Sequence, residues 1–287
     1  MEEINIKIDR FYGLIANYVE GGPDTRYKSW EWCHKAFMIK KDEYWATNDQ
    51  TIQDRIVDYL ALHLAFYLAS WGMYRGSSFL LQRDYKAHKP AVRYMLEERY
   101  CLLWDYQPQE KNINEATNLL FSEDEAELGI YHKIKDSYNL IEDDSDTPTD
   151  TLITKILMGT YGCVPAYDRF LKSGIAAHTN CYGRYINGIR LTQSINRNTF
   201  QALAHLAINH SNEFVNNAVD FYYPPMKCID MYFWEIGYEI DIASGLINNA
   251  NGDEKKNALL NLAVELRLCN EGLTYEDAHS EIMIKNQ

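Results

Sequence analysis

The chain lacks the cysteine spacing and the long apolar runs that mark several protein classes. Its six cysteines include no CxxC pair, and their wide spread argues against a zinc site and a disulfide scaffold. No stretch reaches 18 uncharged apolar residues, because the best candidate, 56–71, carries Asp58 and His63. The first residues are acidic and include no basic leader followed by an apolar run. We therefore expect a cytoplasmic protein, prokaryotic in style, with reduced thiols, no membrane span and no secretory signal.

Patterns typical of common catalytic and metal sites are also missing. His205 and His210 stand five apart, whereas two metal ligands on one helix need a spacing of three or four. The stretch around Gly159 and Gly162 lacks the lysine and the spacing of a nucleotide-binding P-loop. The sequence thus predicts no metal and no cofactor, and it does not decide whether the chain is an enzyme.

The residues that are present predict a helical protein. Hydrophobic residues make up 46% and charged residues 24% of the 287 residues, which is ordinary for a globular chain. Apolar residues recur with helical periodicity, so we expect an all-α, multi-helix bundle in a single domain, 1–287. The expected helices are 3–19, 25–41, 50–74, 88–104, 112–121, 123–141, 149–161, 164–173, 197–220, 224–247, 254–270 and 274–284.

Two segments within this pattern need separate treatment. Apolar residues fall on nearly every side of a helix over 56–71, so that helix should be surrounded by protein. Asn187-Gly188 stands between two short β-prone runs and favours a short β-hairpin near 184–191, with an ordered loop as the alternative.

Charge is distributed unevenly along the chain. The net charge is −13, and the window 105–150 holds thirteen acids against three bases. We interpret this window as an acidic helical insertion or lid, dispensable for folding, whose acidic side faces solvent or a protein partner. The following window, 151–212, holds six bases against one acid, so overall acidity does not exclude a polyanion ligand. The alternative is that these bases pair internally with the acidic block.

The first candidate site follows the apolar helix 56–71. Arg75 stands between two glycines, and Ser77 and Ser78 come directly after them. We expect Arg75 to be at least half buried and paired with Asp168 or Asp230, because an interior charge needs a partner. Such a group can bind a carboxylate or phosphate. The alternative is a helix stop in which Ser77 caps the next helix.

The second candidate site is the basic, tyrosine-rich run 155–197. The stretch from Val164 to Asp168, Val-Pro-Ala-Tyr-Asp, resembles the Val-Pro-x-Asp step of helix-hairpin-helix DNA glycosylases, with one extra residue. The resemblance implies a catalytic role for Asp168 on a nucleic acid. It covers ~20 residues, and the upstream Leu-Pro-Gly-x-Gly hairpin of that family is missing.

Further along the chain, Lys227 and Asp230 are three apart and can pair.

Two classes of function remain open. The first is an intracellular binding or interaction protein with an internal, arginine-centred polar pocket. The second is an enzyme acting on a nucleotide or nucleic acid through Arg75, Asp168 and the segment 155–197. The first is preferred, because no complete catalytic constellation is visible. The oligomeric state is left open. The candidate ligand-binding residues are Arg75, Ser77, Ser78, Arg169, Lys172, Arg184, Arg190 and Lys227.

Overall fold

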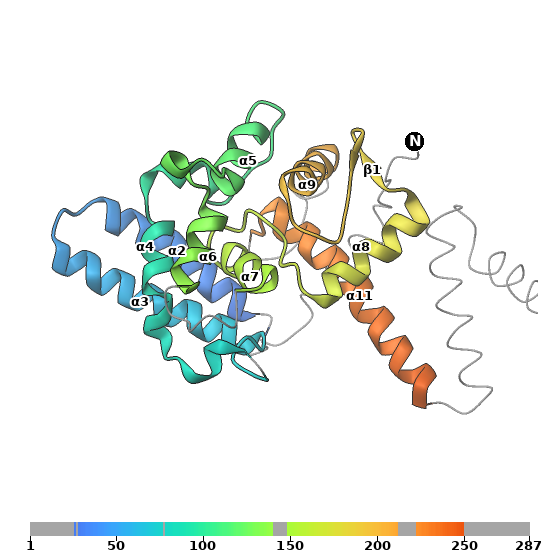
Figure 1. Cartoon of the computed structure of the whole chain (residues 1–287), viewed down its shortest axis with the longest axis horizontal. Coiled ribbons are helices and arrows are strands. Elements are labelled where there is room, and N and C mark those ends of the chain that lie inside the picture. Colours follow the sequence, from blue (N-terminus) through green and yellow to red (C-terminus); the bar gives the residue numbers. More distant parts are fainter. Residues whose placement is uncertain (1–25, 27, 77, 140–147, 212–221, 250–287) are drawn as a thin grey trace, which may run out of the picture.

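A computed structural model of the chain describes residues 26, 28–76, 78–139, 148–211 and 222–249. Helices dominate these residues and the only strands within them form one short hairpin, so the expected all-α fold is confirmed (Figure 1). The expected helices 3–19, 254–270 and 274–284 lie outside the described residues. Within the described part of the chain, no helix is both long and apolar enough to cross a membrane.

An antiparallel helix pair begins the described structure. Helix α2 (Lys28–Trp45) and helix α3 (Gln50–Ser70) lie side by side. The Asp49 side chain caps α3 by accepting from the amides of Thr51 and Ile52. At the other end of the pair, Ser70 Oγ donates to Ser29 Oγ at 2.6 Å. One face of α3 packs in the core and the other is exposed, so the described residues do not surround this helix.

The segment after α3 is broken into short helical turns. It forms the 3-10 helices η1 (Phe79–Gln82) and η2 (Tyr85–His88), then α4 (Lys89–Met95) and the 3-10 helix η3 (Glu98–Leu103). The single helix expected over 88–104 is therefore wrong. The break has a local reason, because the Leu96 carbonyl accepts from the Trp45 indole at 2.7 Å and the chain turns out of the helix at Glu97.

The acidic block packs in the core. It contains α5 (Ile113–Phe121), the 3-10 helix η4 (Glu125–Glu127) and α6 (Ile130–Asn139). Residues 123–127 face solvent, as expected for its acidic side. Leu120, Ile134 and Tyr138 are nevertheless fully buried in the same hydrophobic core as the other helices. This packing does not support the expectation that the block is a dispensable insertion, because its removal would open the core.

The loop 161–168 and its last residue, Asp168, determine where the helix after α7 begins. Helix α7 (Asp150–Thr160) leads into the loop 161–168, and α8 (Arg169–Tyr182) follows. The helix expected over 164–173 starts later because side chains bind the loop amides: Ala166 N donates to Asp230 and Tyr167 N donates to Thr154 Oγ1, each at 2.8 Å. Asp168 then caps α8.

The expected hairpin is confirmed. Strands β1 (Tyr185–Ile186) and β2 (Ile189–Arg190) pair antiparallel, with Tyr185 opposite Arg190. Asn187 and Gly188 both have positive φ, 48° and 75°, as a two-residue type I′ turn requires. The hairpin packs on α9 (Arg197–Asn209), so it does not depend on its own two strands for stability.

The last described helix lies along α8. Helix α11 (Pro225–Asn249) and α8 approach so closely that each has a glycine facing the backbone of the other (Figure 1). A Cβ on Gly174 would lie 1.9 Å from the Phe233 carbonyl oxygen, and a Cβ on Gly237 would lie 1.9 Å from the Phe170 carbonyl oxygen. These two glycines therefore define the crossing point of α8 and α11.

We expect Gly174→Ala to lower the free energy of unfolding by about 1–3 kcal/mol, because the new methyl group overlaps backbone and forces the helices apart. This occurs although alanine is the better helix former by about 1 kcal/mol. Urea unfolding of the variant measures the effect. Ser173→Ala, at an exposed neighbouring position of α8, is the control and should leave stability nearly unchanged. An unaltered midpoint for Gly174→Ala would mean that the helices do not meet there.

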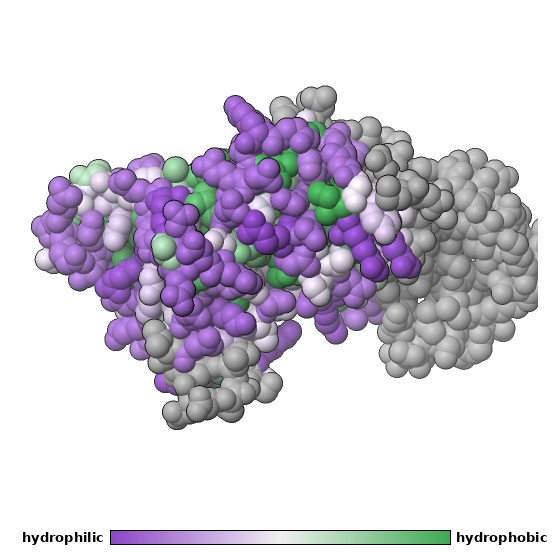
Figure 2. Space-filling view, turned by 45° about the horizontal axis from the view of Figure 1, so that its top comes forward, coloured by the Kyte–Doolittle hydropathy of each residue, from purple (hydrophilic) through white to green (hydrophobic). Residues whose placement is uncertain are grey.

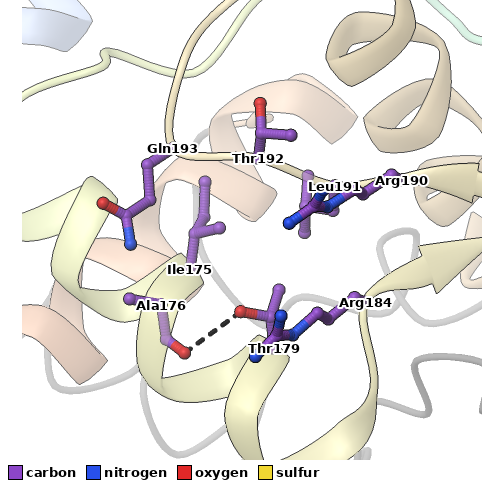
Figure 3. A pocket seen from close by; sticks show the side chains of 8 residues that line it. All are labelled: Ile175, Ala176, Thr179, Arg184, Arg190, Leu191, Thr192 and Gln193. Atoms are coloured by element: carbon purple, nitrogen blue, oxygen red, sulfur yellow. Dashed lines mark hydrogen bonds between the residues drawn. The ribbon is translucent and has the colours of Figure 1, made fainter.

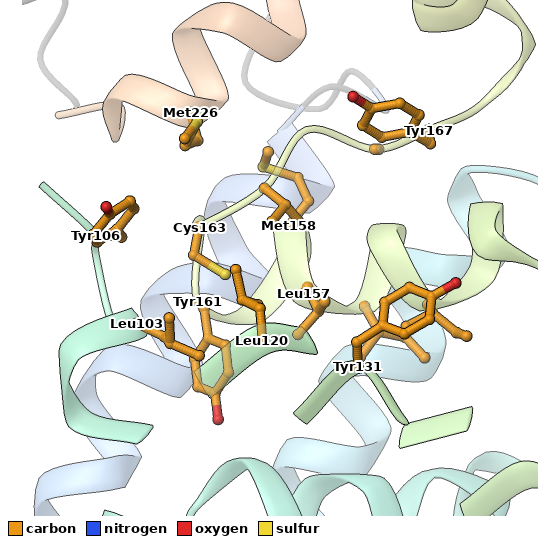
Figure 4. Close-up of a cluster of buried hydrophobic side chains, with 14 of the residues drawn as sticks. Leu103, Tyr106, Leu120, Tyr131, Leu157, Met158, Tyr161, Cys163, Tyr167 and Met226 are labelled. Carbon is orange, nitrogen blue, oxygen red and sulfur yellow. The ribbon is translucent and has the colours of Figure 1, made fainter. Parts of the chain in front are cut away.

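The hydrophobic core lies between these helices. Figure 4 shows side chains from α5, α6, α7 and α11 meeting in it, with Leu120, Leu157, Tyr161 and Met226 each fully buried. The face shown in Figure 2 is mainly hydrophilic, with small groups of apolar residues between the polar ones.

Candidate functional site

A pocket opens between α8 and the β-hairpin. Its cavity volume is about 310 Å³, which suits a small molecule. Figure 3 shows side chains of α8 on one side, the hairpin arginines on the other and the segment after β2 above. The lining residues are Ile175, Ala176, Thr179, Arg184, Arg190, Leu191, Thr192 and Gln193. Two residues of the predicted ligand-binding set, Arg184 and Arg190, are thus brought together.

Local structure places the two arginines at the pocket. Arg184 follows Gly183, whose φ of 103° ends α8 and turns the chain into β1. The carbonyl of Arg184 accepts from Leu191 N at 2.9 Å, which closes the hairpin and sets Arg190 beside it on β2. In Figure 3 both guanidinium groups reach the pocket from the hairpin side.

Hydroxyl groups complete the polar lining. Thr192 Oγ1 lies 2.8 Å from Thr199 Oγ1 on α9, which fixes the segment after β2. Thr179 Oγ1 donates to the Ala176 carbonyl at 3.1 Å, so toward a ligand this hydroxyl can only accept, whereas the Gln193 amide can both donate and accept. Among the described residues that line the pocket, none is acidic. Two permanent positive charges over neutral polar groups favour an anion, and guanidinium groups bind carboxylate or phosphate in a bidentate manner.

The predicted pairing of Arg75 with Asp168 or Asp230 is wrong. Arg75 is exposed, and its guanidinium lies over Gly72, where a Cβ would be 2.6 Å from Nε. The positive φ of Gly72, 76°, turns the chain outward after α3, so the arginine reaches solvent and needs no interior counter-charge. Ser78 caps η1 and donates to the Met73 carbonyl at 2.6 Å. Ser77 lies outside the described residues.

The two acids proposed as partners of Arg75 pair with lysines instead. Asp168 accepts from Lys155 Nζ at 2.9 Å, and Asp230 accepts from Lys227 Nζ at 2.8 Å. The pairing of Lys227 with Asp230 is confirmed, and both side chains are buried. Because Asp168 also caps α8, its contacts give it a structural role. None of Arg75, Asp168 and Lys227 lines the pocket between α8 and the β-hairpin.

The remaining predicted bases lie on α8. Arg169 pairs with Asp241 on α11 at 3.2 Å, in an exposed ion pair. Lys172 is partly buried and does not line the pocket. The alternative of an internal charge zipper is not supported by the pairs of Lys155 and Arg169, whose partners lie outside the acidic block. Arg197 and His205 of the same window, 151–212, do contact that block, at Asn118 and Glu110.

Two buried histidines were not singled out from the sequence. His34 Nδ1 donates to the Thr160 carbonyl at 2.8 Å, and the His34 ring stacks on Trp30 with centroids 4.8 Å apart. His88 lies between two tyrosines, with Nε2 2.6 Å from Tyr74 Oη and Nδ1 2.5 Å from Tyr138 Oη. Burial lowers the pKa of each histidine from 6.5 to about 4, although the Thr160 bond at His34 and the charge of Asp84 near His88 oppose the shift. Both rings are neutral at pH 7.

No sequence rule identified Lys155, Thr179 or Gln193. Lys155 meets Asp168 across a loop, thirteen residues away, and the two pocket side chains are common polar types without a spacing signal. Within the described residues, no three histidine, cysteine or acidic side chains gather as a metal site would require. Comparison with family models, curated proteins and solved structures finds no match to this chain.

Proposed function

We propose that this chain is a binding protein for a small anionic compound, held in the pocket between α8 and the β-hairpin. The observation that carries the proposal is the convergence of Arg184 and Arg190 on one cavity of about 310 Å³. This pocket takes the place of the one expected around Arg75. Its size suits a phosphate ester or a small carboxylate, and the threonine hydroxyls and Gln193 supply neutral contacts that orient it.

Binding is favoured over catalysis by the chemistry of the lining. Its described side chains are arginine, threonine, glutamine and apolar groups, none of which transfers a proton readily near pH 7. Asp168, the candidate catalytic residue, is held by Lys155 and by the first amides of α8. The enzyme alternative, the cytoplasmic location and a protein partner for the acidic block stay predictions.

Calorimetric titration at low salt tests the proposal. Inorganic phosphate, adenosine monophosphate, succinate and a single-stranded oligonucleotide serve as separate probes, so that phosphate, nucleotide, carboxylate and polymer binding are distinguished. We expect Arg184→Gln and Arg190→Gln each to weaken binding of the preferred small anion by about 10-fold or more, because each removes a charged hydrogen-bond donor. The protein should stay folded, since both arginine side chains are exposed.

Lys172→Gln is the matched control. It removes the same charge from α8 but lies outside the pocket, so it should leave the affinity unchanged. Equal weakening by all three variants would indicate a diffuse charge effect, and absence of binding by every small anion at millimolar concentration would overturn the proposal. Oligonucleotide binding with a steep salt dependence and no small-anion binding would favour the nucleic-acid alternative.

A further inference from the structure

The outer face of the α2–α3 pair exposes large apolar side chains. On α3 these are Ile52, Tyr59, Leu62 and Phe66, and on α2 they are Trp32 and Ile39, with exposed fractions between 43% and 64%. Lys40 of α2 lies over the Tyr59 ring at 5.6 Å, so the exposed sides of the two helices meet on one surface. Single exposed apolar residues are common, but a group on adjacent helices marks an interaction surface.

The exposed residues of α3 follow a coiled-coil spacing. Steps of three and four residues alternate along one stripe, formed by Ile52, Arg55, Tyr59, Leu62, Phe66 and Ala69. This is the a/d pattern by which a helix packs against a second helix. The opposite face of α3, with Leu60 and Leu64, is already buried in the core. The helix is therefore apolar on both sides, as the sequence over 56–71 indicates, and one side is not covered by any part of the chain that the structure describes.

We propose that a second copy of this chain covers the α2–α3 face, with α3 packing antiparallel against α3 of the other copy about a two-fold axis. The inference is independent of the anion pocket, which lies on other elements.

The stripe on α3 is complementary to itself in this arrangement. With the axis between Leu60 and Ala61, Ile52 lies opposite Ala69 and Tyr59 lies opposite Leu62 of the second copy, so a large side chain meets a smaller one. Arg55 lies opposite Phe66, where its guanidinium can contact the ring face. No charged residue of the stripe meets its own copy. A two-fold interface requires such self-complementarity.

Helix α2 supplies an independent check of the same axis. The Ser29–Ser70 hydrogen bond and the Lys40–Tyr59 contact fix the alignment of α2 with α3. In that alignment the axis passes between Met38 and Ile39 of α2. Lys35, which is exposed, then lies opposite exposed Asp42 of the second copy, whose carboxylate also accepts from Lys41 Nζ of its own helix at 2.6 Å. The two copies of Ile39 lie side by side. The position of the two-fold axis was chosen from the residues of α3 alone. It nevertheless brings opposite charges of α2 together.

The area is sufficient for a stable dimer. Six large side chains, each about half exposed, present on the order of 600 Å² per copy, or ~1,200 Å² for the pair. The total of ~1,200 Å² is at the lower end of the range for specific interfaces, and the ~600 Å² per copy is at the upper end of the apolar patches of typical monomers.

Sedimentation equilibrium over a concentration series tests the dimer. We expect the wild-type chain to dimerise and Leu62→Glu to raise the dissociation constant at least about 100-fold, since two copies of the charge enter one apolar seam. Leu81→Glu makes the same change at an exposed leucine of η1, outside this face, and should leave dimerisation unaltered. A wild-type monomer at every concentration, or a dimer that Leu62→Glu does not weaken, overturns the proposal.

A charge exchange tests the two-fold arrangement itself. Lys35→Asp places two acids opposite each other, and Asp42→Lys places two bases opposite each other, so each should weaken the dimer about 10-fold. The double variant, Lys35→Asp with Asp42→Lys, restores opposite charges and should recover most of the affinity. Melting temperatures of the monomers check that the fold is intact. Additive weakening in the double variant would show that these residues do not face each other and would overturn this axis.

Discussion

Acidification from pH 7 to pH 4 is expected to lower the free energy of unfolding by about 3 kcal/mol for each of two buried histidines, His34 and His88. The pKa of each is about 4 in the folded protein, compared with 6.5 for an ordinary histidine. Burial is the main cause, because a charged imidazole in the core loses its hydration.

The direction follows from proton binding. Below pH 6.5 the unfolded chain takes up a proton at each histidine, whereas the folded chain does so only near pH 4. The unfolded state therefore binds more protons in this window, and stability falls as the pH falls from 6.5 to 4. Above pH 6.5 both states are neutral at these positions, and the contribution is fully present.

Urea unfolding at a series of pH values between 4 and 8 measures this loss. We expect His34→Gln and His88→Gln each to remove about half of the histidine-linked loss, although each variant is less stable than the wild type at pH 7. His132→Gln, at a partly exposed position, is the control and should keep the full pH dependence. A wild-type curve without a slope between pH 6.5 and 4 would show that these rings are hydrated in the folded protein.

The parts of the fold that depend on neighbouring residues in the sequence were predictable. Asn187-Gly188 encodes a type I′ turn without help from the rest of the chain, and the hairpin follows. The later start of α8 was not predictable, because Asp230, on a distant helix, binds the amide of Ala166 and holds the loop extended. Helical periodicity cannot reveal such a contact.

The site was predictable only in part for a related reason. Arg184 and Arg190 stand on either side of a recognisable hairpin, so their proximity follows from a local signal. Arg75 follows a strongly apolar helix, and the prediction of its burial assumed that the chain continues inward. The positive φ of Gly72 turns it to solvent, and a glycine in the sequence does not reveal the direction of that turn.

The buried ion pairs connect the core to the elements of the pocket. Asp230 accepts from Lys227 Nζ and from Ala166 N, each at 2.8 Å, and so fastens the loop 161–168 to α11. Asp168, at the end of the same loop, binds Lys155 of α7 and caps α8. The orientation of α8, and with it one wall of the pocket, therefore depends on two carboxylates that do not themselves line the pocket.

Asp230→Ala is expected to lower the free energy of unfolding by about 3–5 kcal/mol, the range for removal of one member of a buried ion pair. The substitution leaves the buried Lys227 ammonium without this counter-charge and removes the acceptor of the Ala166 amide. Asp241→Ala, which breaks the exposed pair with Arg169, is the control and should change stability little. Chemical unfolding at pH 7 measures both.

A double-variant cycle separates the charge from the amide contact. Asp230→Asn retains a side-chain acceptor for Ala166 N but still removes the negative charge, so most of the loss should remain. Lys227→Met with Asp230→Asn removes both charges, and should recover at least half of the loss, because the desolvation of the Lys227 ammonium is then relieved. If Asp230→Asn alone restored wild-type stability, the aspartate would act mainly through the loop amide, and the ion pair would contribute little to holding α11 against the start of α8.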